Sequence, residues 1–297
     1  MKKVLITGAG GTVGKQLVTY LLCEGKYNLT LLDLKINKHK SYFKKYKKRL
    51  NFIYSDLSNV NLKNIVKGYD YIIHLASVLP PMSEIKKELT EIVNYDVVND
   101  LVKNIKKYNK DAYFIFLSTT SLYGVGKKNV TVRSKKDSCN NEYVESKIKG
   151  ENVITKNLKN YVILRMPIIL SNIKNESIIC NVGRNELVNV ITKEDASRAI
   201  VSVLNNISKV NRKILNIGGN DTFTMNYKTL EQKLYKSYGF SLKYMLKKSC
   251  VAKNMSSPVC SDVSKFNNIL NYQEDNFDDY LKRLVRKNYF KKFKRKK

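Results

Sequence analysis

The sequence has few of the residue types that build metal sites and disulfide frameworks. It contains only 2 His, 4 Pro and no Trp among 297 residues. Its 5 Cys are odd in number and form no C-x-x-C pair, and the two His are isolated. This pattern argues against a disulfide framework, a zinc ribbon and any other metal site. Because cysteines without a framework are typical of a reducing compartment, we expect a cytoplasmic protein.

Long hydrophobic runs are also absent. No apolar stretch approaches the roughly 18 residues that a membrane span requires. The opening "MKKVLITGAG" begins with lysines, as a signal peptide does, but its apolar run is short, ends in glycines and has no A-x-A cleavage site. We therefore expect a soluble chain whose first residues form a buried strand.

Acidic residues are scarce, with 25 Asp and Glu against 55 Lys and Arg and a formal net charge of +30. Such an excess is typical of proteins that bind nucleic acid or anionic membranes. The excess is mostly Lys in a chain rich in Asn, Ile and Tyr, so we interpret it as a solvated face and disfavour nucleic acid as a partner. The basic tail 283–297 is expected to be a solvated, frayed terminus, with contact to an anionic membrane surface as the alternative.

The first half of the chain alternates short β-branched runs with segments of helical period. Predicted strands cover 2–8, 28–34, 50–57, 69–77, 112–121 and 161–167, and predicted helices cover 14–25, 88–109 and 143–157. Strands that alternate with helices are typical of βαβ units and a parallel sheet. The sequence therefore predicts the α/β class, with a doubly wound parallel sheet of the Rossmann type.

The pattern becomes less regular after Pro167. We expect a loop-rich stretch to about residue 188, then a helix over 193–206, a strand over 213–219 and a helix over 224–238. This predicts a Rossmann domain over 1–167, a reduced substrate lobe over 168–282 that is interleaved with late Rossmann elements, and the basic tail.

A glycine-rich turn follows the first strand. Gly8 permits the tight turn, Gly11 lets the backbone approach a pyrophosphate, and Gly14 lets helix and strand pack closely. Thr12 and Val13 lie between the last two glycines, at the start of the helix, and belong to the same expected site. The turn predicts binding of a dinucleotide.

Asp33 ends the second strand, 19 residues after Gly14. A carboxylate there accepts hydrogen bonds from the adenosine ribose hydroxyls. Because it also repels a 2′-phosphate, NAD is favoured over NADP. Lys35, Lys38 and Lys40 follow and would attract that phosphate, which leaves NADP as an alternative.

Tyr143 and Lys147 are four residues apart in the predicted helix 143–157. The same spacing occurs three times in the sequence, as chance predicts for a chain this rich in Tyr and Lys, so spacing alone carries no information. Only Tyr143 follows the glycine turn, the acidic strand end and a hydroxyl-bearing fifth strand in order. A Lys one helical turn away would favour the phenolate of Tyr143 by its charge.

With these motifs the chain resembles the extended short-chain dehydrogenase/reductase family, also called the NAD-dependent epimerase/dehydratase family. "SDL" resembles its third-strand motif, "HLAS" its fourth-strand motif, "FLSTTSLYG" its fifth-strand signature and "VILRMP" its sixth-strand segment. The resemblance implies cofactor contacts at Asp56, Leu57, Ala76, Ser77, Lys147 and Pro167, beside those of the glycine turn. It also implies that Thr119 orients the substrate, that Tyr143 exchanges the proton and that Lys147 activates it while holding the nicotinamide ribose.

The resemblance implies an NAD(P)-dependent oxidoreductase or epimerase that transfers hydride on a sugar, a sugar nucleotide or a related hydroxy or carbonyl compound. The alternative is a catalytically inactive dinucleotide-binding sensor or scaffold. A homodimer through the helices 84–108 and 143–157 is a further implication of the resemblance.

Three departures from the family pattern concern the substrate. Ile168 replaces an Asn that contacts the substrate diphosphate in many members, and only about thirty residues separate Arg165 from Asp195. Both features argue against a sugar nucleotide. Thr120 and Ser121 stand where the dehydratase branch has an Asp-Glu pair, so we disfavour a 4,6-dehydratase.

Overall fold

The computed structural model describes residues 1–36, 41–138, 140–170, 185–238 and 257–293. Its body is a seven-stranded sheet in the order β3-β2-β1-β4-β5-β6-β9, with every neighbouring pair parallel. The strands are β1 (Lys2–Thr7), β2 (Tyr27–Asp33), β3 (Leu50–Tyr54), β4 (Tyr71–His74), β5 (Tyr113–Thr119), β6 (Tyr161–Met166) and β9 (Lys213–Asn216). The strand order reverses between β1 and β4, which confirms the predicted doubly wound fold.

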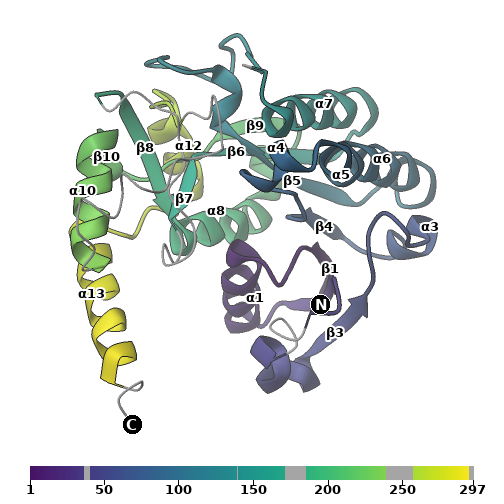
Figure 1. Cartoon of the computed structure of the whole chain (residues 1–297). Coiled ribbons are helices and arrows are strands. Elements are labelled where there is room, and N and C mark those ends of the chain that lie inside the picture. Colours follow the sequence, from purple (N-terminus) through teal and green to yellow (C-terminus); the bar gives the residue numbers. More distant parts are fainter. Residues whose placement is uncertain (37–40, 139, 171–184, 239–256, 294–297) are drawn as a thin grey trace.

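Helices cover both faces of this sheet (Figure 1). One face carries α1 (Thr12–Glu24), α8 (Lys193–Asn205) and α12 (Val263–Leu270), and the short segments η1 (Lys44–Arg49) and α9 (Ile207–Val210) flank it. The other face carries α3 (Leu62–Ile65), α6 (Val97–Tyr108) and α7 (Glu142–Asn157), with α4 (Met82–Ile85), α5 (Lys87–Glu91) and a π-helical turn, η2 (Ile92–Asp96), leading into α6.

Side-chain alternation along β1 explains why two cores form. Val4 and Ile6 belong to the core beneath α1 and α8, whereas Leu5 belongs to the core beneath α6 and α7. Successive side chains of a strand point to opposite faces, so a strand covered on both faces reads as a continuous apolar run. This packing holds the carboxyl ends of the strands, where ligands bind in such sheets, in fixed positions.

A second, three-stranded sheet lies after Pro167, where the sequence predicted loops to about residue 188. Its order is β10-β8-β7, built from β7 (Ile168–Leu170), β8 (Leu187–Thr192) and β10 (Thr224–Asn226). The expectation of loops was wrong for β7 and for the first residues of β8, and the helix expected over 224–238 begins three residues later, because 224–226 form β10. The strands β7 and β10 have only three residues each, too few for a period to be read, and β8 begins 17 residues after β7 ends. The short 3-10 turns η3 (Thr120–Tyr123) and η4 (Asp221–Phe223) complete the described elements.

The C-terminal helix α13 (Phe277–Phe293) packs along α10 (Tyr227–Tyr238), as Figure 1 shows. Its first turns bury Phe277, Tyr280 and Leu284 in the core of the small sheet. The expected frayed terminus, 283–297, was therefore wrong at Leu284, and the expected boundary between 282 and 283 falls inside a helix. Within the described ranges, none of the helices combines the length and the apolar composition that crossing a bilayer requires.

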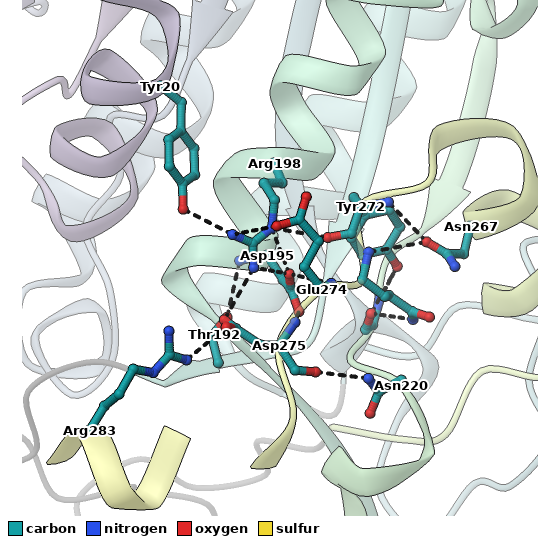
Figure 2. A network of polar contacts seen from close by, with 12 residues as sticks. Tyr20, Thr192, Asp195, Arg198, Asn220, Asn267, Tyr272, Glu274, Asp275 and Arg283 are labelled. Carbon is teal, nitrogen blue, oxygen red and sulfur yellow. Dashed lines mark hydrogen bonds and ion pairs between the residues drawn. The ribbon is translucent and has the colours of Figure 1, made fainter. Parts of the chain in front are cut away.

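A polar network joins this C-terminal segment to α8 and α1 (Figure 2). The Asp195 carboxylate accepts hydrogen bonds from Arg198 Nε at 2.9 Å and from the backbone N–H of Asp275 at 3.2 Å. Arg198 Nη1 donates to the Tyr20 hydroxyl of α1 at 3.0 Å, and Thr192 Oγ1 donates to the Asp275 carboxylate. The chain after α12 is therefore bound to the nucleotide-binding half of the fold.

The packing of α13 leads to a stability prediction. Leu284 is 7% exposed, whereas its neighbour Val285 is 49% exposed. We expect Leu284→Ala to lower the free energy of unfolding by about 2 kcal/mol, because it removes buried methyl groups and leaves a cavity. Val285→Ala should change it by less than about 0.5 kcal/mol. Urea unfolding of both variants measures the difference, and equal losses would show that α13 does not pack as described.

Candidate active site

The glycine turn and Asp33 meet at the carboxyl ends of β1 and β2. The Gly8 N–H donates to the Leu32 carbonyl at 3.0 Å, which anchors the turn to β2. The Asp33 carboxylate accepts hydrogen bonds from the N–H groups of Gly10 at 2.5 Å and Leu34 at 2.8 Å. The structure thus brings together two features that the sequence separates by about twenty residues. Thr12 and Val13 form the first turn of α1 directly behind the glycines.

The glycines make contacts that no side chain would allow. A Cβ atom on Gly14 would lie 2.5 Å from the carbonyl oxygen of Ala9. A Cβ atom on Gly11 would meet only the Gly8 oxygen, at 3.2 Å. Gly14 therefore packs helix against turn, while Gly11 is exposed and closes the turn, since its N–H donates to the Gly8 carbonyl at 3.1 Å and its carbonyl accepts from the Lys15 N–H at 3.1 Å. This cradle at a helix N-terminus fits the phosphates of a dinucleotide.

Asp56 and Leu57 follow β3, at the next strand end. The Asp56 carboxylate is exposed and accepts hydrogen bonds from Ser58, from its N–H at 2.9 Å and its hydroxyl at 2.8 Å. Leu57 is 8% exposed and packs in the core beneath α6. The two expected adenine contacts therefore differ, because only Asp56 presents its side chain to the surface.

The loop after β4 is held by a residue that sequence reasoning missed. Asn94, in the π-helical turn η2, is 1% exposed. Its Oδ1 accepts from the Ser77 hydroxyl at 3.0 Å and from the Val78 N–H at 2.7 Å, and its Nδ2 donates to the Val78 carbonyl at 3.0 Å. Ala76, before Ser77, lies against the glycine turn. The signal in the sequence was an Asn within an otherwise apolar helical stripe.

The three expected catalytic residues converge at the end of β5. Thr119 is the last residue of β5, and its side chain shares a hydrogen bond with the Tyr143 hydroxyl. Lys147 Nζ donates to the Leu117 carbonyl at 2.9 Å and lies 5.7 Å from the centre of the Tyr143 ring. Tyr143 is 8% exposed and Lys147 is 3% exposed. The pair shares the face of α7 that is turned to the sheet.

The backbone at both ends of this trio is fixed by capping bonds. Helix α7 begins after Asn141, whose side chain accepts from the Val144 N–H at 3.0 Å. The Ser121 N–H donates to Thr119 Oγ1 at 3.1 Å. Pro167 is buried directly after Met166, the partner of Thr119 in the β5–β6 register. Pro167 therefore lies at the same edge of the sheet.

Burial governs the titration of the pair. It raises the pKa of the Tyr143 phenol, which the hydrogen bond from Thr119 only partly offsets. It lowers the pKa of Lys147 to about 7, while Glu151 acts in the opposite direction. Desolvation disfavours the Lys147 ammonium in the cofactor-free protein, so its expected activation of Tyr143, together with an oxidised nicotinamide, stays a prediction.

His74 and the other Tyr-x-x-x-Lys spacings are separate from this chemistry. His74 is 1% exposed, and its Nδ1 lies 2.8 Å from Thr7 Oγ1, as expected for a satisfied core histidine. Tyr123 is followed by Gly124 at φ 89°, so no continuous helix joins it to Lys127. Residue 244 lies outside the described residues. Among those that the structure describes, no three His, Cys, Asp or Glu side chains form a metal-binding group.

A family model described as "NAD dependent epimerase/dehydratase family" matches residues 4–182. The chain belongs to this family. The match begins in β1 and includes the glycine turn, Thr119, Tyr143 and Lys147, so the family expected from these motifs is confirmed.

Two curated relatives match part of the chain. An "Uncharacterized UDP-glucose epimerase YtcB" of Bacillus subtilis (strain 168) is 29% identical over 133 residues, 41% of each chain. The "Bifunctional polymyxin resistance protein ArnA" of Wigglesworthia glossinidia brevipalpis is 27% identical over 163 residues, which are 54% of this chain and 22% of that protein. The chain thus spans less than half the length of these relatives.

Two solved structures match nearly the whole chain. UDP-glucuronic acid 4-epimerase from Bacillus cereus, in complex with NAD, has a TM-score of 0.74 and 21% identity, and the match covers 95% of this chain and 99% of that one. DesIV, a dTDP-glucose 4,6-dehydratase from Streptomyces venezuelae with NAD and TYD bound, has a TM-score of 0.78 and 19% identity, with 96% of both chains covered. These matches confirm the predicted fold over nearly the full chain.

Proposed function

We propose that this protein is an NAD-dependent oxidoreductase or epimerase that acts on a hydroxyl-bearing carbon of a sugar nucleotide. The observation that carries the proposal is the convergence of Thr119, Tyr143 and Lys147 at one strand end, in the same sheet as the glycine turn and Asp33. Relatives named for UDP-glucose and UDP-glucuronic acid support the substrate class. The short segment that argued against a sugar nucleotide includes 171–184, outside the described residues.

Residues at the strand ends would hold the cofactor. The N–H groups at the start of α1 would bind the pyrophosphate, Asp33 would accept from the adenosine ribose hydroxyls, and Asp56 would contact the adenine. Ala76 and Ser77 would line the same cleft, as would Pro167, buried at the edge that carries Thr119. When bound, NAD supplies the acceptor and donor of hydride.

The chain's own side chains would handle the proton and the orientation. Thr119 Oγ1 would hydrogen-bond the substrate oxygen and align its carbon, and the Tyr143 hydroxyl would exchange that oxygen's proton. Lys147 would hold the nicotinamide ribose and place a positive charge near the phenol. Because Lys147 already has a pKa of about 7, its charge would change within the physiological range.

Two measurements test this proposal. Calorimetric titration with NAD⁺ should show one site per chain, and incubation with UDP-glucose and UDP-glucuronic acid should yield an epimer or oxidised product by chromatography. Absence of binding to both NAD⁺ and NADP⁺ would remove the proposal entirely. Tight binding without product from any sugar nucleotide would instead favour an inactive dinucleotide-binding sensor or scaffold.

Asp33 gives a sharper test of the cofactor site. We expect Asp33→Ala to weaken NAD⁺ binding about 10- to 100-fold, because each lost hydrogen bond to a charged group is worth about 1.5–3 kcal/mol. It should also reduce the preference for NAD⁺ over NADP⁺. Asp70→Ala is the matched control, since the Asp70 carboxylate bonds Lys2 and Lys3 at the amino ends of the strands, away from the glycine turn. If calorimetry shows that Asp33→Ala and Asp70→Ala lose the same NAD⁺ affinity, Asp33 does not bind the adenosine ribose.

Three further expectations stay predictions. They are the homodimer, which the exposed Ile85 and Leu89 near the α5–α6 helices support, the contact of the basic tail with an anionic surface, and a cytoplasmic location. The division at residues 167 and 282 is likewise a proposal.

A further inference from the structure

Glu151 is a buried carboxylate that the proposed mechanism does not use. It lies on α7 one helical turn beyond Lys147 and is 0% exposed. Its Oε1 accepts from Ser118 Oγ at 2.6 Å and from Arg165 Nε at 2.9 Å, and its Oε2 accepts from Arg165 Nη2 at 2.7 Å. Lys136 Nζ lies 2.9 Å from Oε2. The carboxylate is therefore fully paired, as a buried charge must be.

The partners of Glu151 are neighbours of the candidate catalytic groups. Ser118 directly precedes Thr119, and Arg165 is the register partner of Ser118 on β6. Lys147 bonds the carbonyl of Leu117, one residue earlier. Two successive residues of β5 are thus bonded to two successive turns of α7, which fixes how far the helix can slide or rotate over the strand.

Arg165 extends the contact toward the C-terminal lobe. Its Nη1 donates to the Tyr123 hydroxyl at 2.6 Å, and that hydroxyl donates to Asn216 Oδ1 at 2.7 Å. Asn216 Nδ2 donates in turn to Asp262 Oδ1 at 2.8 Å, just before α12. The chain of hydrogen bonds therefore runs from α7 through β6 and β9 to the start of α12, on the opposite face of the main sheet.

We propose that Glu151 is a positioning residue, which fixes α7 against the ends of β5 and β6 so that Lys147 and Tyr143 stay aligned with Thr119. The inference rests on the proposed function of these three residues. A buried Arg–carboxylate pair stabilises a fold no better than well-packed apolar residues do. The directed hydrogen bonds of this pair, however, fix one orientation of α7 on the strands, and the negative charge of Glu151 lies one helical turn from Lys147.

The charges around Lys147 make this role measurable. The titratable groups facing it are Tyr143 and Glu151 on its own helix and His74 on β4, while Arg165 and Lys136 lie beyond Glu151. Of these, Glu151 is the group that favours the charged form of Lys147. Loss of the Glu151 charge should therefore lower the pKa of Lys147, by about one unit for a neighbour at this spacing.

The experiment measures the Lys147 amine directly in the full-length, cofactor-free protein. Acetic anhydride labels only the neutral amine, and mass spectrometry quantifies the Lys147 peptide from pH 5 to 10. We expect a midpoint of about 7 in the wild type and about one unit lower in Glu151→Gln. Glu151→Asp keeps the negative charge, so its midpoint should lie closer to that of the wild type than to that of Glu151→Gln. This measurement does not depend on enzymatic turnover. The Lys147 midpoint can therefore be interpreted even if the proposed function is wrong.

Asp195→Asn is the matched control, because it breaks another buried Arg–carboxylate pair, with Arg198. It should lower the melting temperature as Glu151→Gln does, yet leave the Lys147 midpoint unchanged. If Glu151→Gln fails to fold, Glu151→Gln with Arg165→Met removes both charges, and because Arg165 lies beyond Glu151 the midpoint should still fall, by less than in the single variant. A wild-type midpoint in the folded single or double variant would overturn the inference and leave Glu151 as a support of the fold only.

Discussion

Replacing Tyr143 with Phe is expected to lower turnover of the proposed sugar-nucleotide substrate by at least about 10³-fold, within the range for loss of a general acid or base. The affinity for NAD⁺ should change by less than about threefold, because the glycine turn and Asp33 are untouched. The ring is 8% exposed and packs in a small core with Leu122 and Val144, so the isosteric Phe keeps the packing. The variant therefore removes the proton exchange alone.

The matched control is Tyr161→Phe. Tyr161 is the first residue of β6, at the amino end of the strand and far from Thr119, and is 7% exposed. Tyr161→Phe therefore removes the same hydroxyl oxygen from a similarly buried ring. Turnover measured by chromatography of the epimer or oxidised product, with NAD⁺ affinity measured by calorimetry, separates the two roles. Turnover of Tyr143→Phe within about tenfold of wild type would show that another group exchanges the proton.

The main sheet could be predicted because each of its strands carries its own signal. In β1 the run "VLI" is apolar on both faces, and Gly25 ends α1 in the left-handed conformation at φ 67°. Asp33 and the glycines were assigned to one site because a carboxylate at the end of the second strand, 19 residues after Gly14, fits the ribose of a dinucleotide whose phosphates lie on the glycine turn. Local sequence was sufficient even for β4 and β9, which pair with β1 and β6 and not with the strand before them along the chain.

The small sheet and α13 could not be predicted in this way, because their order depends on distant partners. Strand β7 is stabilised by pairing with β8 and by the Ile168 N–H bond to Ser257 Oγ at 3.0 Å. In α13, the stripe of Phe277, Tyr280 and Leu284 was hidden among charged residues of both signs. The basic composition suggested a frayed end, but the apolar stripe decided the packing.

Asn94 and Glu151 were missed for a different reason. Asn94 interrupts an apolar stripe, a weak signal, whereas Glu151 is one of many polar residues in α7 and nothing in the sequence marks it as the buried one. Their roles emerge only when the loop after β4 and the strand pair β5–β6 are brought against them. A resemblance to family motifs identified the groups expected to do chemistry, whereas the groups that hold them required the structure.

Gly8→Ala is expected to be among the most damaging single changes in this chain, and the reason is geometric. Gly8 has φ +67°, and an added Cβ atom would lie 2.6 Å from the Ala76 nitrogen and 2.7 Å from the Ala76 Cα. Both are backbone atoms of the segment after β4, so no side chain can move aside. We expect a loss of about 3 kcal/mol in the free energy of unfolding, from the left-handed backbone and the clash together.

Gly25→Ala isolates the clash, because Gly25 has the same φ of +67° and an added Cβ would meet nothing within 4 Å. It should lose only about 1 kcal/mol, the cost of the left-handed conformation alone. Gly8→Ala should in addition weaken NAD⁺ binding at least tenfold, about 1.4 kcal/mol, because Ala76 must move away from the turn that would hold the pyrophosphate. Urea unfolding and NAD⁺ calorimetry on both variants measure these effects. Equal stability losses and equal affinities would mean that the turn and the segment after β4 do not touch, and the cofactor cleft would then have a different wall.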